Sequence, residues 1–94
     1  MTIRDMLYLV TIQEEKSITK AAAKLFVAQP ALSQCLQKIE KELSAVIFTR
    51  TPSGVYPTQE GQCFLEFAAQ TLLKHQDMRK QIDDLKYMDR GMVR

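Results

Sequence analysis

Residues 17–43 contain two helical hydrophobic patterns separated by a short break, and this arrangement restricts the possible folds more than any other feature. In the first pattern, apolar side chains recur at i, i+3, i+4 and i+7, as they do along one face of an α-helix. These side chains are Ile18, Ala21, Ala22 and Leu25. Small alanines on this face allow a second helix to approach closely. We therefore expect two packed helices joined by a tight turn.

The second pattern belongs to a helix with one apolar and one polar face. At roughly 100° per residue, the apolar face carries Leu32, Cys35, Leu36, Ile39 and Leu43. The polar face carries Gln29, Ser33, Gln34, Gln37, Lys38 and Lys41. Amides and hydroxyls donate and accept hydrogen bonds, as base edges in the DNA major groove require. The alternative is that these side chains form an ordinary solvated face.

Local signals mark where the two helices begin. Ser17 occupies the N-cap position of the first helix. Pro30 lies in the first turn of the second helix, where its missing N–H costs little. Phe26 and Val27 are expected to cover the turn between them. Together these features predict a helix-turn-helix.

The pattern changes from helical to extended after the second helix. Residues 46–50 and 55–57 read as short strands, and Thr51-Pro52-Ser53-Gly54 between them favours a tight turn. Such a hairpin beside a helix-turn-helix is a wing, in which Arg50 and Ser53 are placed to contact phosphates or the minor groove. The alternative is a surface hairpin with a solvated arginine.

Another helix is expected at the start of the chain, over residues 3–15, with Thr2 as its cap. Its apolar side chains cover more than one face, and they are Ile3, Met6, Leu7, Tyr8, Leu9, Val10 and Ile12. One face can pack on the helix-turn-helix, so the remainder needs another partner. Deep burial within the chain and a subunit interface both remain open.

A long helix is expected from residue 59 to about residue 90, because no proline follows Pro57 and Gly91 favours a helix end. Its length would be about 45 Å. Apolar side chains recur at three and four residue intervals, as in paired helices, and a second copy of the chain would cover them. The predicted dimer interface consists of Leu9, Phe64, Ala68, Leu72, His75, Met78, Ile82 and Leu85.

Several short motifs in this order resemble the DNA-binding domain of LysR-type transcriptional regulators. The resemblance runs from Ile3 to about Leu73, and the matching motifs are Ala21-Ala22, Leu25, Gln29-Pro30-Ala31-Leu32-Ser33, Ile39-Glu40, Leu43, Phe48, Arg50, and Thr58 with Gly61. It implies a mostly α winged helix-turn-helix of three helices plus a two-stranded wing over residues 1–58. A dimerising linker helix would follow over residues 59–90, with a tail at 91–94.

In the resembled family, an effector-binding domain of two α/β lobes follows the linker helix, and this chain stops before it. An isolated fragment and a naturally short relative both remain open. Three positions depart from the family pattern: Ala28 replaces a capping serine, Gln34 an arginine and Ser44 a glycine. These changes affect the expected sequence preference rather than the fold.

The predicted DNA interface divides into residues that read bases and residues that position the protein. Base contacts are expected from the N-terminal half of the second helix. Backbone contacts are expected near the start of the first helix and at the wing. The predicted residues are Thr19, Lys20, Gln29, Pro30, Ser33, Gln34, Gln37, Lys38, Arg50 and Ser53.

Composition limits the alternatives. With 94 residues the chain allows one domain, and a net charge of +2 does not by itself indicate nucleic acid. Cys35 and Cys63 have neither zinc-ligand nor disulfide-framework spacing, so no metal or cofactor is expected, and Cys35 reads as a buried small residue. No signal peptide or membrane span is recognisable, which predicts a cytoplasmic protein without a membrane partner.

These observations favour sequence-specific binding of double-stranded DNA by a homodimeric bacterial-type transcriptional regulator on an operator with two-fold related half-sites. A higher assembly is left open for a full-length protein, and a small-molecule effector is expected only if a missing C-terminal domain exists. The alternative function is a winged-helix protein-interaction or dimerisation module without DNA readout. An enzyme is not expected, because the chain has one histidine, no phosphate-cradling glycine loop and no clustered carboxylates.

Overall fold

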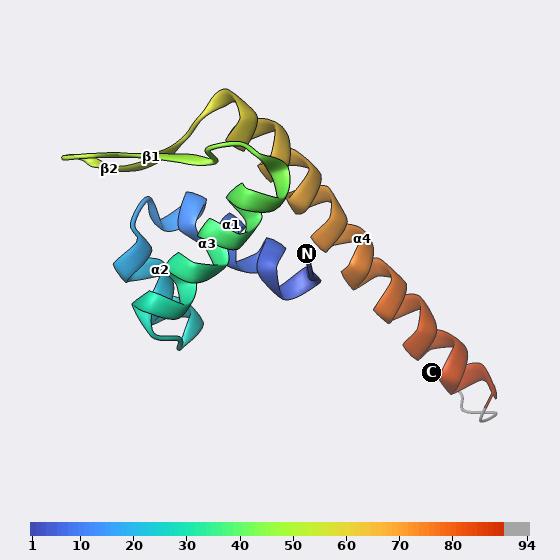
Figure 1. Cartoon of the computed structure of the whole chain (residues 1–94). Coiled ribbons are helices and arrows are strands. Elements are labelled where there is room, and N and C mark those ends of the chain that lie inside the picture. Colours follow the sequence, from blue (N-terminus) through green and yellow to red (C-terminus); the bar gives the residue numbers. More distant parts are fainter. Residues whose placement is uncertain (90–94) are drawn as a thin grey trace.

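The computed structural model describes residues 1–89 and has a small helical body from which one long helix projects (Figure 1). Three helices come first, α1 (Ile3–Glu15), α2 (Ile18–Leu25) and α3 (Gln29–Leu43). The antiparallel strands β1 (Phe48–Thr51) and β2 (Gly54–Pro57) follow, and α4 (Gln59–Asp89) ends the described chain. The mostly α fold with a helix-turn-helix and a two-stranded wing is therefore confirmed. The expected helix end at Gly91 and the tail at 91–94 lie outside the described residues.

The helix starts follow the local sequence signals. Thr2 and Asp5 form a capping box, in which each side chain accepts a hydrogen bond from the other residue's backbone N–H. Ser17 Oγ accepts from the N–H of Lys20 at 3.1 Å. Helix α3 begins after Ala28 without any side-chain cap. The departure at Ala28 therefore leaves one helix terminus less well satisfied than the others.

Each of the first three helices ends at a residue in the left-handed conformation, namely Lys16, Phe26 and Ser44. The backbone N–H of Phe26 bonds to carbonyls of α2 and closes the turn, while its side chain is 94% exposed. The expectation that Phe26 covers the turn is thus wrong, because the residue that closes the backbone turn directs its ring into solvent. Val27 does pack against the core.

Helix α1 lies at the centre of the body and packs against both the helix-turn-helix and α4. Leu9 is 0% exposed, and Phe64 and Ala68 at the start of α4 are buried in the same core. These three residues have almost no surface left for a second subunit to cover, which corrects their assignment to a dimer interface. Burial within the chain accounts for most of the apolar residues on α1, but Leu7 remains 44% exposed.

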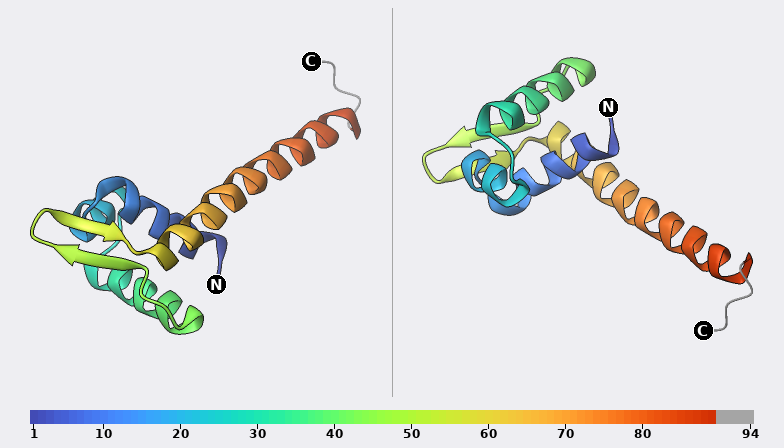
Figure 2. Two further views of the ribbon diagram at one scale, coloured as in Figure 1. Left: turned by 90° about the horizontal axis from the view of Figure 1, so that it is seen from above. Right: turned by 90° about the horizontal axis from the view of Figure 1, so that it is seen from below.

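The wing is attached to the end of α1. The N–H of Val55 donates to the carbonyl of Lys16 at 3.0 Å. Gly54 has φ +141°, and a Cβ there would lie 2.9 Å from the same carbonyl oxygen. Glycine is required at this position for both reasons. The hairpin consequently extends from the body at the end opposite to α4, as the views in Figure 2 show.

Helix α4 begins in close contact with the segment before the wing. Thr58 Oγ1 accepts from the N–H of Gly61 at 2.9 Å, and the N–H of Thr58 donates to the carbonyl of Ile47 at 2.9 Å. A Cβ on Gly61 would lie 2.0 Å from that carbonyl oxygen. The direction in which α4 leaves the body therefore depends on Gly61. Within residues 1–89, no helix combines the length and apolarity needed to cross a bilayer.

Candidate nucleic-acid interface

Helix α3 presents its polar face to solvent, as the sequence pattern predicts. Leu32, Leu36 and Ile39 are buried against the body. On the other side, Gln29, Pro30, Gln34 and Gln37 are exposed and Ser33 is half-buried. Because α3 is anchored by its apolar face, the amides on its outer face can enter a groove without disturbing the core.

A hollow of about 450 Å³ separates the helix-turn-helix from the wing. It brings together five of the residues that the sequence predicts for DNA contact, namely Thr19, Lys20, Gln29, Arg50 and Ser53. Thr19 Oγ1 donates to Gln29 Oε1 at 3.4 Å, so the start of α2 is linked to the start of α3. The N-terminus of α2 also opens here, since Ser17 and Ile18 line the same hollow. A helix N-terminus attracts anions, so this surface is suited to bind the phosphates of a DNA backbone.

The tip of the wing is held by its own hydrogen bonds. Thr51 Oγ1 lies 3.1 Å from Ser53 Oγ and donates to the carbonyl of Gly54 at 2.9 Å. Tyr56 Oη donates to the carbonyl of Ser53 at 3.3 Å. These bonds order the turn, while the Arg50 side chain remains exposed beside it.

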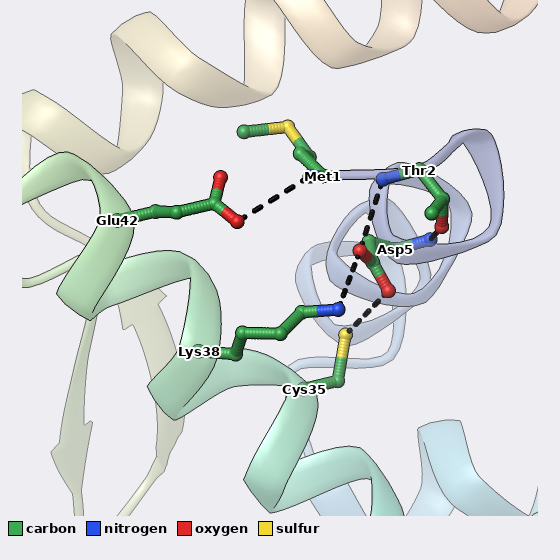
Figure 3. Close-up of polar contacts among 6 residues, drawn as sticks. All are labelled: Met1, Thr2, Asp5, Cys35, Lys38 and Glu42. Atoms are coloured by element: carbon green, nitrogen blue, oxygen red, sulfur yellow. Dashed lines mark hydrogen bonds and ion pairs between the residues drawn. The ribbon is translucent and has the colours of Figure 1, made fainter.

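The ammonium group of Lys38 is paired with a carboxylate of the same chain. Its Nζ donates to Asp5 Oδ2 at 2.9 Å, and Asp5 is 4% exposed (Figure 3). Burial alone would raise the pKa of Asp5, but hydrogen bonds from Lys38, the Thr2 N–H and Cys35 outweigh burial and lower that pKa to about 2. The hydrogen bond to Asp5 in turn raises the pKa of Lys38. Both groups therefore stay charged at neutral pH.

Sequence reasoning missed the part that Asp5 plays in this cluster. The spacing of Thr2 and Asp5 is that of a capping box, but nothing in the sequence relates Asp5 to the polar face of α3. Cys35 is buried, as predicted, and its Sγ donates to Asp5 Oδ1 at 3.4 Å. Burial, followed by the neighbouring Asp5 charge, raises the pKa of the Cys35 thiol to about 11. The thiol is consequently a protonated donor rather than a reactive thiolate.

The projecting part of α4 carries apolar side chains that the body does not cover. Leu72 and His75 are half-buried, whereas Met78, Ile82 and Leu85 are exposed. Sequence reasoning missed further exposed apolar residues on the same helix, which are Phe67, Leu73, Tyr87 and Met88. Leu73 and Tyr87 lie on other sides of the helix from the predicted stripe at about 100° per residue, so periodicity did not select them. Phe67 lies at the same angle around the helix as Leu85, and Met88 follows Leu85 by three residues, so both extend the stripe. Residues 1–89 contain no group of three or more His, Cys, Asp or Glu side chains suited to a metal ion.

Comparison with known proteins finds relatives that are helix-turn-helix transcriptional regulators. A family model described as bacterial regulatory helix-turn-helix protein, lysR family, matches residues 3–62. The uncharacterised regulator YkuM of Bacillus subtilis is 41% identical over 92% of this chain. PgrR of Escherichia coli, named an HTH-type transcriptional regulator, is 36% identical over 98% of this chain. The matches span 29% and 31% of the lengths of YkuM and PgrR, respectively.

Solved structures agree with the fold. A complex of the BenM DNA-binding domain with catB site 1 DNA superposes with a TM-score of 0.88 at 36% identity, covering 92% of this chain and 97% of that one. A CbnR DNA-binding domain in complex with DNA gives a TM-score of 0.85 at 27% identity, covering 92% of this chain and 99% of that one. The chain therefore belongs to the lysR family of bacterial regulatory helix-turn-helix proteins.

Proposed function

We propose that this chain is the sequence-specific, double-stranded-DNA-binding part of a dimeric transcriptional regulator. The observation that carries the proposal is the exposed amide face of α3 beside the hollow that joins α2 to the wing. Helix α3 occupies the major groove, and the wing contacts the backbone or the minor groove. The similar BenM and CbnR DNA-binding domains, solved in complex with DNA, support this assignment.

Base readout comes from the N-terminal half of α3. Gln29 and Gln34 each offer the paired donor and acceptor that recognise adenine. Pro30 suits a thymine methyl group, and Ser33 suits a hydrogen bond to any base. Gln37, one turn further along, reaches either a base edge or a phosphate. Thr19, Lys20, Arg50 and Ser53 position the protein on the sugar-phosphate backbone.

Self-association follows from the exposed apolar residues of α4. Ile82 and Leu85 are 44% and 57% exposed on a helix that the body no longer supports. Pairing with α4 of a second copy removes this surface from water. A two-fold dimer presents two copies of α3, so the operator contains two related half-sites. The role on bacterial DNA implies a cytoplasmic protein without an enzymatic activity.

A selection from a pool of random duplexes tests the proposal. The wild-type chain should enrich a sequence with two related half-sites. Its affinity should fall steeply as salt rises, because bound phosphates release counterions. A protein-interaction module would enrich no sequence, and its association with a protein would be nearly insensitive to salt. Either of these results would overturn the proposal.

A further inference from the structure

A second hollow lies between α1 and α3, on a side of α3 away from the wing. It has a volume of about 400 Å³, and its lining includes Arg4, Tyr8, Gln34 and Lys38 above the buried Asp5. No residue of the wing lines it. Its charged groups are two cations and one carboxylate, so the hollow carries a net positive charge.

Contacts with neighbouring side chains hold the two cations of this hollow, Arg4 and Lys38, in place. The Arg4 guanidinium carbon lies 5.9 Å from the centre of the Tyr8 ring, within the range of a cation–π contact. Asp5 uses Oδ2 to hold Lys38 Nζ at 2.9 Å, as Figure 3 shows. An ammonium group has three donors, so the bond to Asp5 leaves Lys38 able to donate to another acceptor. The Lys38 side chain is also 53% exposed.

The hollow at α1 and the hollow at the wing lie on opposite sides of the face of α3 that is proposed to read bases. Gln29 lines the hollow at the wing, and Lys38 lines the hollow at α1. Nine residues at about 100° each place Lys38 roughly 180° around the helix from Gln29. Pro30, Ser33 and Gln37 project between these two directions. A helix with its side chains is about 10–12 Å wide and the major groove about 12 Å, so the two flanks of α3 meet opposite walls of the groove.

We propose that the hollow between α1 and α3 binds a backbone phosphate of the DNA strand that lies across the major groove from the strand at the wing. Arg4 and Lys38 donate hydrogen bonds to the phosphate oxygens, and the planar guanidinium suits a two-point contact. Tyr8 and Asp5 are positioning residues that hold Arg4 and Lys38. This inference rests on the proposed DNA binding of α3 and adds α1 to the interface.

Single methylphosphonate substitutions test the inference, because each one removes the charge of one phosphate. The duplex is the operator obtained by selection, substituted at one position at a time on either strand. Wild-type protein should lose affinity at positions on both strands of a half-site. The affinity of the Arg4→Gln protein should no longer fall when phosphates on one strand are substituted, but it should still fall when phosphates on the other strand are substituted. Arg50→Gln should show the reverse pattern.

Salt dependence supplies a second measurement. Arg4→Gln should make the slope of log K against log salt shallower by about one unit, and Arg4→Lys should restore the slope. Arg79→Gln, which removes the same charge from the exposed surface of α4, should leave slope and sensitivity unchanged. If the wild type binds DNA while Arg4→Gln keeps the wild-type slope and sensitivity on both strands, the inference is overturned. Absence of salt-dependent DNA binding by the wild type would instead overturn the proposed function.

Discussion

Asp5 Oδ2 accepts a hydrogen bond from Lys38 Nζ at 2.9 Å. This bond joins the beginning of α1 to the C-terminal half of α3. The same carboxylate accepts from the Thr2 N–H at 3.0 Å and from Cys35 Sγ at 3.4 Å. One side chain thus caps α1 and ties it to the helix that carries the base-reading residues. A change at Asp5 therefore affects both stability and the orientation of α3.

The first prediction concerns acid stability. The pKa of Asp5 is lowered from 3.8 to about 2 in the folded chain, so the folded state favours the charged carboxylate. Its contribution is present in full above the unfolded pKa of 3.8 and is lost as pH falls through the folded pKa of about 2. The contribution is about 2 kcal/mol, since one pKa unit corresponds to about 1.4 kcal/mol. Asp5→Asn should remove it, and urea unfolding between pH 7 and pH 2 measures the difference.

The control for this prediction is Lys38→Met, which removes the partner cation and keeps the aliphatic stem. In a double-mutant cycle at neutral pH, the two changes should be non-additive because they remove the same ion pair. Additive losses would contradict the stabilising ion pair between Asp5 and Lys38. The same would follow if the unfolding free energy of Asp5→Asn fell at low pH by as much as that of the wild type.

The second prediction concerns Gly61 at the start of α4. A methyl group there would lie 2.0 Å from the carbonyl oxygen of Ile47, and neither backbone can yield without moving the helix. Gly61→Ala should therefore cost about 1–3 kcal/mol of unfolding free energy, although alanine favours a helix. Gln62→Ala, at the next and exposed position, should stay within about 0.5 kcal/mol of the wild type. A stabilised Gly61→Ala protein would show that α4 and the Ile47 segment are not in close contact.

The third prediction concerns the end of α3. Ser44 has φ 51°, a left-handed conformation that glycine adopts without steric cost. Ser44→Gly should stabilise the fold by about 0.5–1 kcal/mol, as measured by thermal or urea unfolding. Lys41→Gly, inside the helix, should destabilise it by about as much. Equal effects of the two changes would argue against the left-handed cap.

The fourth prediction concerns base readout. Gln34 is exposed on the proposed base-reading face of α3. Gln34→Ala should cost about 1–3 kcal/mol on the preferred operator and relax selectivity at one base pair. Affinities for a panel of single-base operator variants provide the measurement, with the exposed Gln62→Ala as the control. An unchanged ranking of the variants would remove Gln34 from the base-reading residues.

The fifth prediction concerns the dimer. Replacing Ile82 and Leu85 together by Asp places charges in the apolar surface that a second copy is proposed to cover. Sedimentation should then show monomers, and operator affinity should fall because the two half-sites no longer act together. Gln81→Asp adds a charge at an exposed polar position of the same helix and should remain dimeric. A wild-type monomer at micromolar concentration would be incompatible with the proposed interface.

Short-range patterns in the sequence were sufficient for the secondary structure and for the polar face of α3. The caps at Thr2 and Ser17, the proline at position 30 and the glycine in the wing turn each act within a few residues, so they can be read along the chain. The apolar periodicity of α3 identified the buried face and, by exclusion, the exposed amides.

Tertiary structure alone decided which apolar and charged residues find partners inside the chain. Leu9 and Leu85 look equivalent in a periodic pattern, yet Leu9 is fully buried by its own chain and Leu85 is exposed on α4. Asp5 and Lys38 are separated by 33 positions, and no local signal relates them. Burial and ion pairing depend on which segments meet in space, whereas periodicity and capping depend only on neighbours along a helix or strand.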